Sequence, residues 1–298
     1  MILQRGWKKY REILNNYRSG ITMNETLEPK EGGRAIAQAL QSNNPYLAGR
    51  MGWMETYITG KLLTDKETTL ALREKLELHA GVFPPTSQEL NLFSATYLEA
   101  AREVDILGLM KGPFEGWLIK AYLPQAERIA LEVLEPYLYS QPWSEQLEGK
   151  TVLVVHPFEK SIAKQYETVR EKIFSNPKIL PKFILKTIKA PQTIAGNSRE
   201  YHSWSETLKE LEKKVKQENF DVAILGCGAY GLPLGASIKK MGKIAIHLGG
   251  ATQLLFGISG GRWKNHQKFQ KLINDSWSSP LEEERPHGWE KIEGGAYW

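Results

Sequence analysis

The sequence predicts an α/β protein, with a Rossmann-like, mostly parallel sheet, helices on both faces and a helical N-terminal region. Near-continuous apolar runs such as residues 151–155 and 221–225 are typical of strands that are buried on both faces. Segments with helical spacing separate these runs, as expected where helices join parallel strands. A glycine pattern directly follows one of the runs, which is typical of a strand that turns into a helix around a ligand.

The N-terminal half is expected to be mostly helical. Helices are predicted at 1–18, 33–40, 54–63, 64–79 and 87–104, with a polar connection at 24–33 and short strands at 46–50 and 105–109. Thr64 and Glu67 have the spacing of a capping box, so Thr64 is expected to begin the helix that ends near His79. The two prolines in the segment 80–85 end that helix. Residues 114–139 have a mixed pattern and receive no assignment.

From Lys150 onward the pattern alternates between strands and helices. The predicted strands are 151–155, 183–188, 221–225 and 243–247, and the predicted helices are 159–174, 204–217 and 232–241. Residues 142–149 are polar and predict a loop. If 46–50 and 105–109 join the same sheet, the whole chain 1–298 is one domain. Residues 1–45 would then be a helical extension, and residues 278–298 a polar C-terminal surface tail.

Composition narrows the classes of function. The net charge is +5, but the 39 Lys and Arg residues are scattered without a dense basic stripe, which argues against nucleic-acid binding. The single cysteine, Cys227, permits neither an intrachain disulfide nor a cysteine zinc cage. Because it lies inside a glycine turn, we expect a small filler side chain rather than a catalytic thiol.

The protein is expected to be cytoplasmic, because the sequence has neither a signal peptide nor an apolar stretch long enough to span a membrane. Residues 7–17 combine aromatic and aliphatic residues with flanking basic ones, so this segment could contact a membrane surface. An ordinary surface helix that packs on the domain is the favoured interpretation of the same pattern.

The glycine loop is the first candidate site. Gly226, Gly228 and Gly231 follow a predicted strand and precede a predicted helix, which is the context of a phosphate-binding turn. A dinucleotide site also needs an acidic residue about 20 positions on, to hold the ribose. That region, residues 244–247, has none, which counts against an NAD enzyme. The alternative is a glycine turn that serves packing alone.

Arg50, Gly52 and Glu55 form a second candidate pattern, R-x-G-x-x-E. An arginine can bind a phosphate through two hydrogen bonds, and a carboxylate can accept a proton from a hydroxyl or hold a cation. The spacing alone favours the alternative, a surface ion pair across one helical turn.

Further candidates follow from the rule that ligands bind outside the carboxyl ends of parallel strands. His156 and His247 end predicted strands, and Tyr230 and Gln253 offer polar contacts to a sugar; the histidines could equally be satisfied by the backbone. The remaining candidates lie in the glycine turns or close a glycine-rich run: Ala229, Gly249, Gly250, Arg262 and Trp263. Arg262 would bind phosphate and Trp263 would stack on a base or sugar, or the pair would anchor a C-terminal helix.

Six motifs together carry a family resemblance: R-x-G-x-x-E, the A-G-x-F-P turn at 80–84, VVHPF, GCGAYG, K-x-A-I-H-L-G-G and the closing RW. Over residues 46–263 the chain resembles a bacterial family of glycosyltransferases from polysaccharide gene clusters, which is similar to the GT-D glycosyltransferase fold. GT-D enzymes carry R-x-G-D-x-E, whose Asp-x-Glu binds a metal and the nucleotide sugar. The matching positions here are Trp53 and Glu55. With only the glutamate retained, no metal ligand is assigned, and dependence on manganese or magnesium is expected to be weak or absent.

The resemblance implies a glycosyltransferase of surface polysaccharide synthesis, which moves a sugar from a nucleotide-diphosphate donor to a saccharide or lipid-linked acceptor. The loop 226–231 is expected to bind the leaving diphosphate, with charge added by Arg50 or Arg262, and Glu55 is expected to act as catalytic base. Peripheral contact with the inner face of the membrane is part of this expectation. The alternatives are a nucleotide-dependent oxidoreductase and a non-catalytic nucleotide- or saccharide-binding protein.

Overall fold

Seven parallel strands form one sheet in the computed structural model, which describes residues 26–65, 69–194, 200–264, 266–291 and 294–298. The strand order is β3-β2-β1-β7-β6-β4-β5, and every neighbouring pair is parallel. The strands are β1 (Tyr46–Arg50), β2 (Ile106–Leu109), β3 (Glu127–Ala130), β4 (Thr151–His156), β5 (Ile184–Lys189), β6 (Val222–Leu225) and β7 (Ile244–His247). The predicted α/β fold with a parallel sheet is confirmed, and both halves of the chain contribute strands to it.

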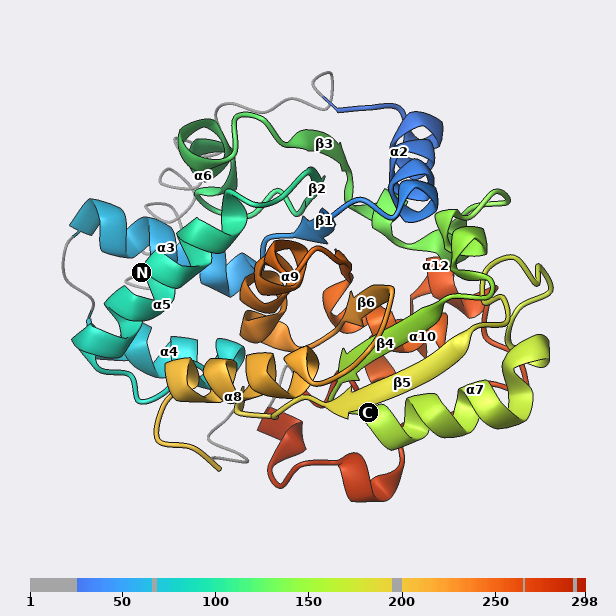
Figure 1. The fold of residues 1–298 in the computed structure, drawn as a ribbon. Coiled ribbons are helices and arrows are strands. Elements are labelled where there is room, and N and C mark those ends of the chain that lie inside the picture. Colours follow the sequence, from blue (N-terminus) through green and yellow to red (C-terminus); the bar gives the residue numbers. More distant parts are fainter. Residues whose placement is uncertain (1–25, 66–68, 195–199, 265, 292–293) are drawn as a thin grey trace.

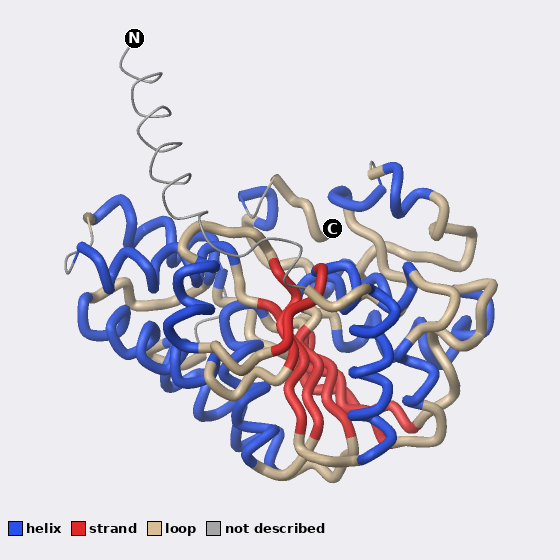
Figure 2. Tube along the Cα trace, turned by 90° about the horizontal axis from the view of Figure 1, so that it is seen from above, coloured by secondary structure: helices blue, strands red, loops and turns tan. Residues whose placement is uncertain are grey.

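Helices cover both faces of the sheet (Figures 1 and 2). The longer ones are α2 (Pro29–Ser42), α3 (Trp53–Asp65), α4 (Leu70–Ala80), α5 (Ser87–Ala101), α6 (Glu115–Tyr122), α7 (Glu159–Ile173), α8 (Trp204–Lys216) and α9 (Gly231–Lys240). Alternate residues of the interior strand β4 enter two separate cores: Leu153 and Val155 join the one formed with α5, α8 and α9, and Val152 and Val154 join the one formed with α2 and α7. This burial of both faces explains the continuous apolar run at residues 151–155.

The chain reverses its winding between β4 and β6. From β4 it passes through α7 to β5 at the edge of the sheet, whereas from β6 it passes through α9 to β7 on the opposite side. Loops that leave two adjacent parallel strands in opposite directions open a crevice at their carboxyl ends, and open α/β sheets bind their ligands there. The fold itself therefore places a candidate site beside the ends of β4 and β6.

Several local predictions are wrong. Thr64 does not begin a helix; it lies within α3, and its hydroxyl donates to the carbonyl of Gly60 at 3.0 Å, which satisfies it without a cap. Helix α2 begins at Pro29, inside the predicted polar connection, because proline suits the first turn of a helix. Residues 142–149 are not a plain loop, since a 3₁₀ turn at Trp143–Leu147 buries Trp143 and Leu147.

The C-terminal segment is not a surface tail. Glu284 is buried, and its carboxylate accepts hydrogen bonds from the backbone of Lys160 and Ser161 at the start of α7. The backbone of Trp298 accepts a bond from Gly261 N, which ties the last described residues to the body of the protein. The predicted helix 1–18, with its candidate membrane segment 7–17, lies outside the described residues. None of the described helices is long and apolar enough to cross a bilayer.

Candidate functional site

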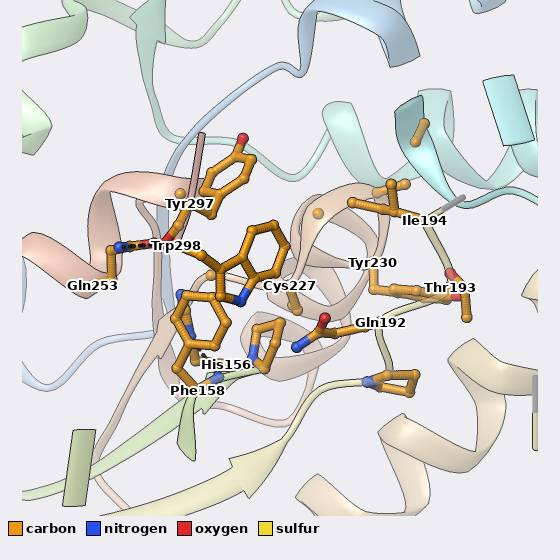
Figure 3. A pocket seen from close by; sticks show the side chains of 17 residues that line it. His156, Phe158, Gln192, Thr193, Ile194, Cys227, Tyr230, Gln253, Tyr297 and Trp298 are labelled. Carbon is orange, nitrogen blue, oxygen red and sulfur yellow. Dashed lines mark hydrogen bonds between the residues drawn. The ribbon is translucent and has the colours of Figure 1, made fainter. Parts of the chain in front are cut away.

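A pocket of about 660 Å³, including its open mouth, lies at the carboxyl ends of β4 and β6 (Figure 3). Loops after β4, β5, β6 and β7 line it together with the segment 297–298. Seven of the sequence-predicted residues belong to its lining: His156, Gly226, Gly228, Ala229, Tyr230, Gly250 and Gln253. The pocket therefore occupies the crevice that the winding of the sheet creates.

Different structural constraints explain why glycine stands at each of the three positions of the predicted loop. A Cβ on Gly226 would collide with the His156 ring, and one on Gly231 would collide with the His247 ring, so these two glycines permit close packing. Gly228 has φ +55° and no neighbouring atom within 4 Å of the place that a Cβ would take. Packing thus explains Gly226 and Gly231, whereas Gly228 presents bare backbone to open space just before α9.

His156 is buried at the floor of the pocket, and its Nδ1 accepts a hydrogen bond from Phe158 N at 2.9 Å. Burial lowers the pKa of His156 to about 3, so the ring is neutral at physiological pH. Because Nδ1 is an acceptor, the proton is assigned to Nε2, which makes that edge of the ring a donor. Burial, and then the positive charge of Arg50, likewise lower the pKa of His247 to about 3.

Aromatic rings form one wall of the pocket. The Trp298 ring packs edge-on against Phe158, with ring centroids 5.7 Å apart, and Figure 3 shows both rings beside His156. Gln253 is fully buried, and its Nε2 donates to Tyr297 O at 3.3 Å, which fixes the segment that carries Trp298. The sequence analysis does not identify four lining residues: Phe158, Gln192, Thr193 and Trp298. For Trp298, the high density of aromatic residues near the end of the chain is the sequence feature that could have indicated a role in the pocket.

Tyr230 and Cys227 serve packing within the pocket wall. Tyr230 is only 2% exposed, stacks on Trp204 and shares a hydrogen bond with Thr193 at 3.0 Å between their hydroxyl oxygens. Its expected role as a polar contact to a sugar does not agree with this arrangement. Burial raises the pKa of the Cys227 thiol to about 12, which keeps it protonated, as expected for a filler side chain.

Arg262 and Trp263 do not line the pocket. Trp263 is 6% exposed and packs edge-on against the Tyr297 ring, and Arg262 Nη1 donates to the Tyr297 hydroxyl at 3.3 Å. The backbone of Arg262 also pairs with Ala296 O at 2.9 Å. These contacts agree with the anchor interpretation of the pair, since they fix the C-terminal segment that closes the pocket.

A polar cluster surrounds Arg50 at the carboxyl end of β1, on the same edge of the sheet as the pocket. Its guanidinium lies against Gly249, the neighbour of the pocket residue Gly250. Glu115 follows β2, and its carboxylate accepts backbone N–H bonds from Met110 at 2.9 Å and Lys111 at 2.5 Å. Burial raises the pKa of Glu115, although these bonds and the charge of Arg50 oppose the shift.

Gly52 and Glu55 belong to the same cluster. Gly52 N donates to the buried hydroxyl of Tyr97 at 2.8 Å, and burial, followed by the charge of Glu55, raises the pKa of that hydroxyl. The Glu55 carboxylate folds back over Gly52 and is half-buried. Arg50, Gly52 and Glu55 therefore lie together, as the pattern R-x-G-x-x-E predicts, but they are outside the lining of the pocket.

These residues do not fit a bound metal. The position that would carry the aspartate of the GT-D pattern is Trp53, whose indole is no ligand, and the Glu55 carboxylate is turned onto Gly52. Within the part of the chain that the structure describes, no group of three or more His, Cys, Asp or Glu side chains could hold a metal ion. We therefore derive no reaction step through a metal.

No protein-family model matches the chain, and no curated protein matches it. A solved structure described as the selenomethionine-substituted "domain of unknown function 1792 (DUF1792)" has a TM-score of 0.46 and 13% sequence identity. That match covers 92% of this chain and 95% of the other.

Proposed function

We propose that this protein is a glycosyltransferase that moves a sugar from a nucleoside-diphosphate sugar to a saccharide or lipid-linked acceptor. The observation that carries the proposal is the pocket at the β4–β6 crevice, which opens beside the exposed backbone of Gly228. The motif resemblance over residues 46–263 supports the same activity. A cytoplasmic location, with contact to the inner face of the membrane, belongs to the proposal.

The pocket suits the nucleoside end of such a donor. Its described lining includes no Asp, Glu, Lys or Arg, and the rings of Phe158 and Trp298 offer an apolar wall to a planar base. The diphosphate would then meet the exposed backbone at Gly228, in the glycine turn that precedes α9. The Nε2–H group of the neutral His156 ring would donate a further hydrogen bond to the diphosphate.

The Arg50 cluster suits the reacting end of the donor. Strand β1 lies two positions from β6 in the sheet, so its carboxyl end is about 10 Å from the glycine loop. In the transfer, the acceptor oxygen forms a bond to the anomeric carbon, and the bond to the diphosphate oxygen breaks with its electron pair. Glu55 takes the acceptor's hydroxyl proton, and the charge of Arg50 stabilises the departing diphosphate.

A non-catalytic nucleotide-binding protein is the second candidate, because the described lining of the pocket is uncharged. An oxidoreductase has less support: β7 ends at His247, and no acidic side chain of the described lining could hold a ribose. These alternatives differ in what they do with a bound nucleotide, so one series of measurements separates them.

The proposal is tested first by thermal shift with UDP, GDP, CDP and ADP. A diphosphate at 100 times its dissociation constant should stabilise the fold by about 2.7 kcal/mol. The matching nucleotide sugars are then incubated with saccharide acceptors, and release of the diphosphate is measured. Binding without release would favour the non-catalytic protein, and a change in nicotinamide absorbance would favour the oxidoreductase. If no nucleotide shifts the melting temperature, the donor site is wrong.

A further inference from the structure

The indole of Trp298 carries a hydrogen-bond donor that has no partner in the part of the chain that the structure describes. Its Nε1 is buried, and the side chain lines the pocket at the carboxyl ends of β4 and β6. The indole nitrogens of Trp143 and Trp204 also lack a partner, but these two side chains lie in the apolar cores, 2% and 0% exposed. A buried donor without a partner is uncommon and costs free energy. Of these three N–H groups, the one of Trp298 belongs to a residue that a ligand can reach.

The backbone of the segment that carries Trp298 is fixed against the pocket. Trp298 O accepts a hydrogen bond from Gly261 N at 2.9 Å. Two glycines permit the close approach of this segment: a Cβ on Gly250 would collide with the Tyr297 ring, and one on Gly260 would collide with the Tyr297 backbone. The packing thus sets where the indole lies, and the side-chain torsions of Trp298 remain to adjust the direction of its N–H.

Gln192 adds a hydrogen-bond acceptor to the lining of the same pocket. Its Nε2 donates to the carbonyl oxygen of Glu284 at 3.1 Å. Because a carbonyl oxygen only accepts, this bond identifies the nitrogen end of the amide, and the other end is the acceptor Oε1. Figure 3 shows the indole nitrogen of Trp298 on the side of its ring that is turned toward the Gln192 amide. The lining therefore combines a neutral donor with a neutral acceptor.

The two aromatic rings of the lining cannot both stack on one planar ligand. The planes of Phe158 and Trp298 are inclined to each other by 71°. A base that stacks on Phe158 therefore cannot also stack on Trp298, and the indole is left for a different kind of contact. The edge of a nucleobase carries carbonyl oxygens, ring nitrogens and N–H groups, which proteins recognise by hydrogen bonds.

We propose that Trp298 and Gln192 bind the edge of the nucleobase of the donor. The indole N–H donates to a carbonyl oxygen or ring nitrogen of the base, and Gln192 Oε1 accepts from an N–H group on the same edge. The inference rests on the proposed glycosyltransferase function and adds to it the residues that orient the base. Neutral partners suit this end of the donor, because the base is uncharged and the described lining includes no Asp, Glu, Lys or Arg.

The test measures, by calorimetry, the dissociation constant of the nucleoside diphosphate that gives the largest thermal shift. Trp298→Phe keeps an aromatic ring and removes the N–H, so it should weaken binding about three- to tenfold, the usual contribution of one neutral hydrogen bond. Gln192→Leu removes the acceptor and should have a similar effect. Inorganic pyrophosphate, measured by competition with the nucleotide, has no base and should bind the wild type and both variants equally well.

Trp289→Phe is the matched control. The Trp289 ring packs against the Trp298 ring, with centroids 6.0 Å apart, but Trp289 does not belong to the described lining of the pocket. The same chemical change at this neighbouring position should therefore leave nucleotide binding unchanged. An equal loss of affinity in Trp289→Phe and Trp298→Phe would show an effect of packing and overturn the inference.

The other outcomes separate this inference from the proposed function. Unchanged nucleotide affinity in Trp298→Phe and Gln192→Leu overturns the base contact alone, and so does an equal loss of pyrophosphate affinity, which would place Trp298 at the phosphates. If Trp298→Phe proves unstable, Gln192→Leu decides. Nucleotide binding that the variants weaken, without any sugar transfer by the wild type, would leave the base contact standing and remove the glycosyltransferase assignment. A wild-type protein that binds no nucleoside diphosphate removes both.

Discussion

The carboxylate of Glu55 lies directly over the Cα of Gly52, in the space where any larger residue would place its Cβ. On the other side, the N–H of Gly52 donates to the Tyr97 hydroxyl at 2.8 Å, which fixes the backbone at this turn. The pattern R-x-G-x-x-E thus has a geometric meaning. Glycine at position 52 lets the glutamate one helical turn later fold back toward the end of β1.

Gly52→Ala should abolish transfer while the protein stays folded. The atoms nearest to the new methyl group would be those of the Glu55 carboxylate, the far end of a side chain that can rotate away at little cost to stability. The carboxylate would then leave its position, and a misplaced base loses much of its contribution. We expect a fall in turnover of about 10²-fold or more, measured by diphosphate release, with the melting temperature within a few degrees of the wild type.

Gly33→Ala is the matched control for that substitution. Gly33 lies within α2, and a Cβ there would meet no atom within 4 Å. Alanine in a helix should stabilise the protein by up to about 1 kcal/mol. Turnover should stay unchanged. If Gly52→Ala behaves like Gly33→Ala, the fold-back of Glu55 has no functional role.

Glu55→Gln should lower the transfer rate by about 10²- to 10⁴-fold, the usual contribution of a general base. Glutamine keeps the size of the side chain and removes its charge, so binding of the donor and the melting temperature should change little. Glu74→Gln, on the exposed surface of α4, should leave turnover unchanged. A Glu55→Gln protein that simply unfolds would favour a structural ion pair with Arg50 instead.

Gly228→Ala should remove the thermal shift that a nucleoside diphosphate produces. Its methyl group would point into the open space beside the pocket, where the diphosphate is proposed to approach the backbone. The positive φ of 55° adds strain of about 1–2 kcal/mol, so the variant will also melt at a lower temperature without ligand. The informative quantity is therefore the ligand-induced shift.

Gly242→Ala separates that strain from the loss of the site. Gly242 follows the other end of α9, has φ +82° and likewise has no atom within 4 Å of the place that a Cβ would take. It should lose similar stability and keep the full nucleotide shift. Equal shifts in the two variants would move the diphosphate away from the glycine loop.

His156 should contribute a loss of stability as the pH drops from 7 to 5. Burial lowers the pKa of His156 to about 3, whereas an unfolded histidine has a pKa near 6.5, so only the unfolded state gains a proton in this range. One such histidine removes about 2 kcal/mol from the free energy of unfolding between pH 7 and pH 5. Urea titrations at the two pH values measure this loss.

His156→Asn isolates the contribution of that ring. Asparagine can still accept the Phe158 N–H, and it does not titrate, so the variant should lose less stability on acidification than the wild type. The comparison between variants is necessary because burial raises the pKa of Glu135 to about 7, and its protonation stabilises the fold over the same range. An identical pH dependence in both proteins would mean that the pKa of His156 is the same in the folded and unfolded states.

Turnover should persist in the presence of a chelator. Trp53 stands where the GT-D pattern has a metal-binding aspartate, so Arg50 and backbone N–H groups are expected to meet the charge of the departing diphosphate. Diphosphate release is measured with EDTA and with added manganese. Activity that disappears with EDTA and returns with manganese would show that substrate phosphates and Glu55 complete a metal site.

Most strands can be recognised from the sequence alone, because strands buried on both faces must be apolar throughout. Strand β1 was predicted at its observed bounds, and the other strands of the interior within a residue or two. The glycine loop was predicted for the same kind of reason, since a turn that approaches a ligand or a packed ring excludes side chains. Such constraints act within a few residues and leave a local signal.

Contacts between residues far apart in the sequence determine the remaining features. Strand β3 carries a single buried residue, Ile129, and forms because its backbone pairs with β2. No local sequence pattern predicts this pairing. Trp298 enters the pocket because Gly261 and Gln253, both far from it in the sequence, hold residues 297–298 in place. Tyr230 packs within the pocket wall, because Trp204 and Thr193 stack on it and bond to it from distant elements. Contacts between distant segments therefore determine which side chains line the site, although several side chains look equally suited to it in the sequence.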